Sequence, residues 1–165
     1  MSSDPINVAS DDFLKQLAAI EPGVYGTPCS VVLKDGSSFE TCLAWKNPRY
    51  SDKGDWIHPE KVAFIVEAPS RMPARFARLF GPGEESGMGY ILFVVELADG
   101  TSFVQVGGGG DIDFLNLPPG YTQKDVVDVL PHAGREQSSK EGYRLTPKFA
   151  SLEYCRPPFL QSITK

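Results

Sequence analysis

Two Asp-Gly turns constrain the fold of this chain more than any other feature of its sequence. Residues 33–39 read Leu-Lys-Asp-Gly-Ser-Ser-Phe, and residues 97–103 repeat that pattern as Leu-Ala-Asp-Gly-Thr-Ser-Phe, 64 residues further along. In each copy an apolar run leads into Asp-Gly and another follows it, which is the strongest local signal for a β-hairpin. A further strand-like run follows each hairpin, at 62–66 and at 112–115. The sequence therefore predicts a β-β-β unit that is used twice.

The loop length of the first hairpin decides which side chains share a face of the sheet. A two-residue turn mixes apolar with polar side chains and sets Cys29 opposite Cys42, whereas a three-residue loop pairs Val31 with Phe39 and sorts the faces better. We therefore predict the three-residue loop, which implies that the two cysteines point to opposite faces and cannot form a disulfide. In the second hairpin the same register leaves both faces apolar, so we expect its strands to form the middle of the fold.

Length and composition agree with one domain of short elements. A chain of 165 residues can bury a sizeable core without a metal or disulfides, and its 16 glycines and 14 prolines are typical of many turns. We predict a mainly β (α+β) fold: a twisted antiparallel sheet or a small barrel, built from the twice-used β-β-β unit, with short peripheral helices. The paired hairpins resemble the strands of small SH3-like and Sm-like barrels, and the resemblance implies architecture alone.

Helix signals flank the predicted strands. Ser10 followed by two acids, with apolar residues along one side, predicts a helix over 10–20. Thr122 with an acid three residues later favours helix over 122–130, but the β-branched run there favours strand, and both alternatives stay open. The expected order is a flexible N-terminus (1–9), then one globular domain (10–165) with the first β-β-β unit (about 28–69), a helix (70–80), the second unit (about 89–118) and a helical C-terminal part (121–165), including a last short helix over 146–154.

Charge and cysteine content limit the classes of partner and compartment. The formal net charge of −5 argues against a general nucleic-acid binder, whose affinity depends on neutralising phosphates. Three cysteines without a Cys-x-x-Cys pair indicate a reducing compartment. No apolar run reaches the ~18 residues of a membrane span, and the first residues do not resemble a signal peptide. We expect a cytoplasmic protein with no membrane contact and no metal or other cofactor.

Two segments carry the side chains best suited to binding. The loop at 46–58 brings aromatic side chains together with cations, a combination that stacks on ligands or partner side chains. The predicted helix at 70–80 carries three arginines at spacings of four and three, which suit a small anionic ligand or an acidic protein surface. The candidate binding residues are Trp45 just before the loop, Arg49, Tyr50, Trp56 and His58 in the loop, and Arg71, Arg75 and Arg78 on the helix.

No recognised catalytic spacing is present, so the sequence does not favour an enzyme. The leading hypothesis is a non-enzymatic binding protein: a small, acidic, cytoplasmic protein-interaction module, for example one that neutralises a basic partner as immunity proteins neutralise toxins. The alternative is a small-molecule sensor or an uncharacterised enzyme, with its pocket between the loop at 46–58 and the arginine helix.

Overall fold

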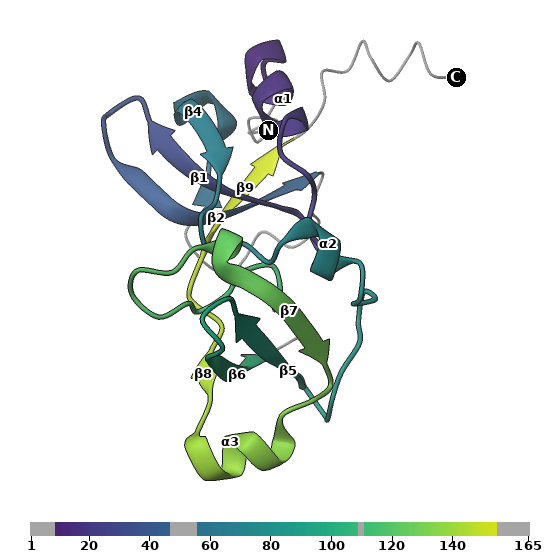
Figure 1. Cartoon of the computed structure of the whole chain (residues 1–165). Helices are drawn as coiled ribbons and strands as arrows, with labels where there is room; N and C mark the ends of the chain where they lie inside the picture. The colour runs from purple at the N-terminus through teal and green to yellow at the C-terminus, as the bar shows by residue number, and fades with distance from the viewer. Residues whose placement is uncertain (1–8, 47–55, 109–110, 155–165) are drawn as a thin grey trace. The chain divides into compact units, whose positions relative to one another are not determined.

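The computed structural model describes residues 9–46, 56–108 and 111–154, and within them the chain is mainly β with a few short helices (Figure 1). The chain divides into two compact units. Unit 1 comprises Met1–Glu21, Gly26–Ala68 and Phe149–Lys165, and unit 2 comprises Pro22–Tyr25 and Pro69–Lys148. The mainly β class is confirmed. The expectation of one domain over 10–165 concerns how these units are joined, and it stays a prediction.

Unit 1 is a five-stranded mixed sheet with one helix. Its strands lie in the order β3-β9-β2-β1-β4; β1 is antiparallel to β2 and β4, and β9 is parallel to β2 and β3. The helix packs Phe13 and Leu17 into the same core as Val31, Ile65 and Leu152. The elements are α1 (Asp11–Ala18), β1 (Thr27–Leu33), β2 (Ser38–Lys46), β3 (Trp56–Ile57), the 3-10 turn η1 (Pro59–Lys61), β4 (Val62–Glu67) and β9 (Ala150–Tyr154).

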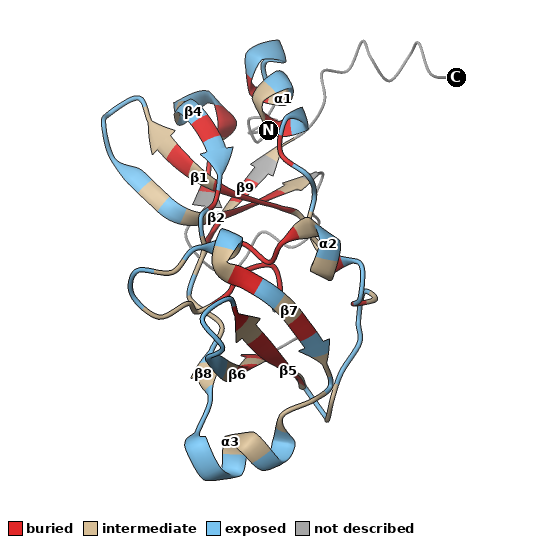
Figure 2. Ribbon diagram, viewed as in Figure 1, coloured by how far each residue is buried: buried red, intermediate tan, exposed pale blue. Residues whose placement is uncertain are grey.

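Unit 2 is a four-stranded mixed sheet in the order β7-β5-β6-β8. The expected burial of the second hairpin on both faces is confirmed for its strand β5, which is buried from Ile91 to Val95 (Figure 2). Phe93 and Val95 lie in one core, and Leu92 and Val94 lie in a second core on the other face. The elements are α2 (Ala74–Ala77), β5 (Tyr90–Leu97), β6 (Ser102–Gly108), the 3-10 turn η2 (Gln123–Asp125), β7 (Val126–Pro131), α3 (Arg135–Glu141) and β8 (Arg144–Leu145).

The two units repeat one pattern that extends beyond the predicted three strands. In each, a helix precedes a hairpin, the first hairpin strand also pairs with a strand that follows a 3-10 turn, and a last strand runs parallel to the second. The third strand of the second copy is β7, and residues 112–115 form no strand, so the prediction of a strand there is wrong. Within that segment Phe114 makes an isolated bridge to Arg71. Neither sheet closes into a barrel over its described strands.

The Asp-Gly turns are built alike. The carboxylate of Asp35 accepts the Ser37 N–H at 2.9 Å, and that of Asp99 accepts the Thr101 N–H at 3.0 Å. The glycine after each aspartate has a positive φ, 89° and 88°, which glycine adopts without the steric penalty of a Cβ. The predicted three-residue loop is confirmed, because Val31 pairs with Phe39.

For the two cysteines of this hairpin, the predicted lack of a disulfide is confirmed, but the prediction that they point to opposite faces is wrong. The register shifts between Val31 and Cys29, so that Cys29 lies directly opposite Cys42 and both side chains join the same core. The Cys29 Sγ lies 3.3 Å from the Cys42 carbonyl oxygen, and both residues are free thiols. A side-chain hydrogen bond with Cys29, and then burial, raise the pKa of the Cys42 thiol. A β-bulge moved these side chains onto one face, and the sequence had no separate signal for it.

The helix predictions met different outcomes. The N-terminal helix is confirmed as α1, with the Ser10 hydroxyl accepting the Phe13 N–H at 3.2 Å. Of the helix predicted at 70–80, only the single turn of α2 is present. Residues 122–130 form η2 and then β7, and the segment at 146–154 forms β9 rather than a helix. Of the flexible N-terminus predicted at 1–9, residues 1–8 lie outside the described residues, as do 155–165, and the prediction is wrong for Ala9, which is buried in the core of unit 1. No described helix has the length and hydropathy that crossing a membrane requires.

Candidate functional site

The predicted binding loop is described only at its ends. Trp45 is half-buried in β2, Trp56 begins β3, and His58 is half-buried before η1. Arg49 and Tyr50 lie outside the described residues. The proposed role of this loop, and the alternative pocket beside it, therefore stay predictions.

The three predicted arginines do not share one helix face. The helix begins only at Ala74, so Arg71 precedes it, and the Arg71 side chain is 0% exposed. Its guanidinium donates to the Met72 carbonyl at 2.9 Å and to the Pro22 carbonyl at 3.3 Å. Arg71 is thus a structural donor inside unit 2, and the expectation that it shares an accessible face with Arg75 and Arg78 is wrong. Arg75 and Arg78 are exposed.

A buried carboxylate holds the short segment Pro22–Tyr25 within unit 2. Asp113 is 4% exposed, and its two oxygens accept the Val24 N–H at 2.6 Å and the Tyr25 N–H at 2.8 Å. Charged acceptors make the stronger hydrogen bonds, so these two contacts fix the segment firmly. The Tyr25 hydroxyl in turn accepts the Gly83 N–H at 2.9 Å. We call the contacts of Asp113 with Val24 and Tyr25 the Asp113 clamp. Through the Tyr25 hydroxyl, this clamp is linked to the loop that precedes β5.

That loop, residues 81–90, is called here the Met88 loop, and its own backbone closes it tightly. The Ser86 N–H donates to the Tyr90 carbonyl at 2.9 Å, and the Leu92 N–H donates to the Ser86 hydroxyl at 2.8 Å. A Cβ on Gly87 would lie 2.5 Å from the Tyr90 ring, so a larger residue there would displace the Tyr90 side chain. The Met88 side chain lies at the apex and is 98% exposed.

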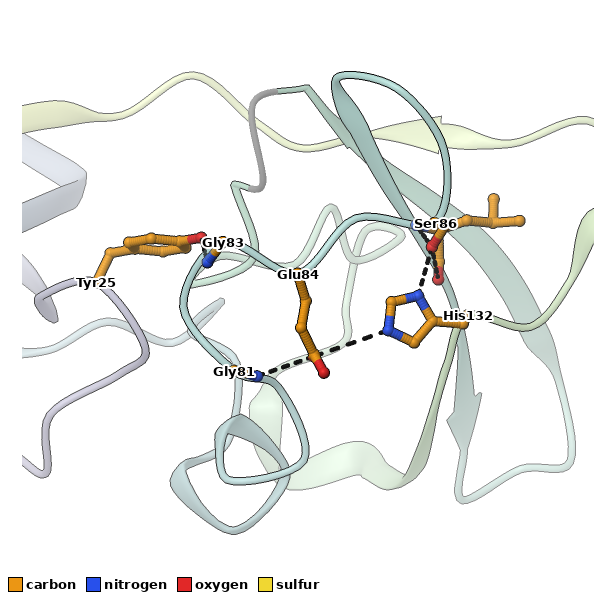
Figure 3. A network of polar contacts seen from close by, with 7 residues as sticks. Tyr25, Gly81, Gly83, Glu84, Ser86 and His132 are labelled. Carbon is orange, nitrogen blue, oxygen red and sulfur yellow. Dashed lines mark hydrogen bonds and ion pairs between the residues drawn. The ribbon is translucent and has the colours of Figure 1, made fainter.

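Two side chains from the segment that follows β7, His132 and Arg135, brace the Met88 loop, and Figure 3 shows the contacts of His132. The His132 ring lies between two loop residues, with Nδ1 2.8 Å from the Ser86 hydroxyl and Nε2 3.7 Å from the Glu84 carboxylate. Arg135 donates to the Ser86 carbonyl at 2.8 Å and to the Tyr90 hydroxyl at 2.9 Å. His132 also has a φ of 58°, the one positive value among the described non-glycine residues.

The Ser-His-Glu grouping is better suited to bracing than to nucleophilic catalysis. A catalytic serine must be able to pass its hydroxyl proton to the histidine while it attacks a substrate. The Ser86 oxygen already accepts the Leu92 N–H and lies 3.3 Å from the Leu92 carbonyl oxygen, so it is tied to the start of β5. A histidine ring in either tautomer can keep the Ser86 contact, because Nδ1 can accept from the hydroxyl or donate to it.

Unit 1 contains a separate cavity of about 360 Å³. It lies between the first half of α1, the tip of the first hairpin, η1 and the start of β4. Its charged lining residues are Asp12, Lys34 and Glu60, and Phe13 and Pro59 contribute apolar surface. Across the described parts of the chain, no group of three or more His, Cys, Asp or Glu residues is arranged to hold a metal ion.

Sequence reasoning missed the Met88 loop. The available signal was a methionine between two glycines, an apolar side chain placed where the backbone turns. The pairing of Ser86 with His132 joins residues that are far apart in the sequence, and no spacing rule reveals it. In comparisons with known proteins, no family model, no curated protein and no solved structure matches the chain.

Proposed function

We propose that this protein is a non-enzymatic, acidic protein-interaction module, and that it binds another protein through the Met88 loop. The observation that carries the proposal is the 98% exposure of Met88 at the apex of a loop braced by His132 and Arg135. Methionine is enriched in interfaces, where its flexible thioether adapts to apolar pockets.

The bracing contacts support binding because they reduce the entropy cost of association. Ordering one residue of a flexible loop costs about 1–2 kcal/mol of conformational entropy. A loop that is already ordered in the free protein loses little further entropy when a partner binds. The contacts to Ser86, Tyr90 and Glu84 come from outside the loop turn itself, from His132 and Arg135. They present Met88 in a fixed position without burying it.

Charge indicates which kind of partner fits. Glu84 and Glu85 are exposed and precede Met88 in the same loop, and the whole chain has a net charge of −5. A complementary partner therefore has an apolar pocket for the methionine and basic side chains around its rim. A basic protein that this module neutralises is one such partner.

The test compares Met88→Ala with the matched control Leu79→Ala, which removes another exposed apolar side chain of unit 2, 51% exposed. A protein retained by the wild type from a lysate of the source organism is purified and titrated directly against all three forms. Burial of a methionine is worth about 2 kcal/mol, so Met88→Ala should weaken the affinity about thirtyfold. Leu79→Ala should leave it unchanged, and the wild-type affinity should fall with added salt.

An equal affinity for wild type and Met88→Ala would refute the proposal, even where a protein had been captured. A loss that Leu79→Ala reproduces would also refute it, because the effect would then not belong to the loop. Unchanged thermal unfolding of both variants establishes that the comparison reports binding and not folding.

A further inference from the structure

The repeated architecture allows the helix and the third strand of the two units to be compared. Arg75 extends from α2 and donates to the Val126 carbonyl, the first residue of β7, at 2.7 Å. Its guanidinium also lies 4.5 Å from the centre of the Phe76 ring, a cation–π distance. A guanidinium supplied by the chain itself therefore joins the helix to the start of the third strand in this copy.

In unit 1 the cavity of about 360 Å³ lies between the helix and the start of the third strand. One contact beside it is repeated in unit 2: the Lys34 N–H donates to the Lys61 carbonyl just before β4, as the Ala98 N–H donates to the Asp125 carbonyl just before β7. Val62, the first residue of β4, lines the cavity and stands where Val126 stands in the other copy.

The charges at this position are opposite in the two copies. By the 64-residue repeat, Asp11 stands at the position of Arg75; Asp11 does not line the cavity, but its neighbour Asp12 does. Glu60 adds a second carboxylate to the lining, and Lys34 adds one ammonium group. The helix of unit 1 thus carries carboxylates where that of unit 2 carries a guanidinium, and one of them lines an open cavity.

We propose that the unit 1 cavity binds a guanidinium group supplied from outside the chain. Asp12 and Glu60 accept from the planar fork of donors, a geometry that carboxylates match in paired hydrogen bonds. Phe13 and Pro59 contact the apolar stem that carries the group. The volume lies within the range of small-ligand sites.

Two sources could supply this chemistry, free arginine or an arginine side chain of a protein. The position of Lys34 distinguishes them, because its ammonium can pair with the α-carboxylate of free arginine, whereas a residue within a polypeptide has no such group. N-acetylarginine amide imitates the polypeptide residue, and agmatine carries the guanidinium without a carboxylate.

The experiment titrates the isotopically labelled full chain with each of these compounds and with citrulline, whose uncharged ureido group has a similar shape to guanidinium. We expect saturable amide shift changes at Phe13, Gln16 and Ala63 with the guanidinium compounds and none with citrulline. Stronger binding of arginine than of N-acetylarginine amide identifies the free amino acid as the source, and the reverse identifies a protein side chain.

The variants Asp12→Asn and Glu60→Gln should each weaken the affinity about tenfold, the value of a charge-assisted hydrogen bond. Asp11→Asn is the matched control, since it removes an exposed carboxylate from the same helical turn without touching the cavity lining. The proposal is overturned if no guanidinium compound gives saturable shifts, if citrulline binds as well as arginine, or if Asp11→Asn weakens binding as much as Asp12→Asn. The Met88 loop plays no part in this titration, so either proposal can fail alone.

Discussion

The clamp made by Asp113 gives the sharpest prediction about stability. Its two oxygens accept the backbone N–H groups of Val24 and Tyr25, and the side chain is 4% exposed. Asp113→Asn keeps one oxygen and turns an NH₂ group toward the other amide, so one bond is lost and two donors face each other. A hydrogen bond to a charged group is worth about 1.5–3 kcal/mol, and the substitution also relieves the cost of burying a charge. We expect a loss of about 2 kcal/mol in the free energy of unfolding.

Urea unfolding measures that free energy, and hydrogen exchange of the Val24 and Tyr25 amides locates the change. The matched control is Asp111→Asn. Burial, and then the charge of Asp113, raise the pKa of Asp111, so its ionised form is disfavoured in the folded state. Removing that carboxylate at neutral pH should leave stability equal or slightly higher. The reasoning is refuted if Asp113→Asn costs less than about 0.5 kcal/mol, or if both amides keep their wild-type protection.

Three further predictions follow from single groups. Gly134→Ala should destabilise unit 2 by about 1–3 kcal/mol in urea unfolding, because φ is 100° and the new Cβ would lie 2.8 Å from a valine methyl group; an unchanged midpoint would contradict this. In a Cys155→Ser background, Cys29 and Cys42 should resist a thiol reagent until denaturant is added, since both are buried, and full labelling of the native protein would count against it. Hydrogen bonds from Thr101 and then Tyr121 lower the pKa of Asp99 to about 2. The wild type should therefore melt at a higher temperature than Asp99→Asn above about pH 4, and this difference should disappear as the pH falls through about 2. A difference in melting temperature that does not change with pH would contradict this prediction.

The sequence predicted best those parts of the fold that depend on neighbouring residues. The Asp-Gly turns, the three-residue loop and the Ser10 cap of α1 are local, and each is confirmed. The Thr122 capping box also forms, but it closes only one 3-10 turn before the β-branched run continues as β7. The segment at 146–154 has a helix start signal and nevertheless becomes a strand, because pairing with β2 and β3 outweighs local propensity.

The candidate sites depended on contacts between distant residues, which the sequence did not reveal. Arginine is usually a surface cation, but the Arg71 guanidinium is buried in unit 2 and donates hydrogen bonds to the carbonyl oxygens of Met72 and Pro22. The Met88 loop depends on His132 and Arg135, which follow a strand that the sequence left undecided between helix and strand. Exposure of a single apolar side chain is ordinary, and it gains meaning only once the bracing contacts are known.

The position of β9 also has a consequence for how the protein is made. Its partner strands β2 and β3 are synthesised early, whereas β9 is translated only after all of unit 2. Unit 2 holds its four strands between Pro69 and Lys148 and can assemble its sheet as it leaves the ribosome, while unit 1 must wait with an unfilled place inside its sheet. Pairings of such long sequence separation form slowly, and open strand edges invite aggregation. Nascent chains stalled before residue 150 should therefore depend on chaperones more than the finished protein does.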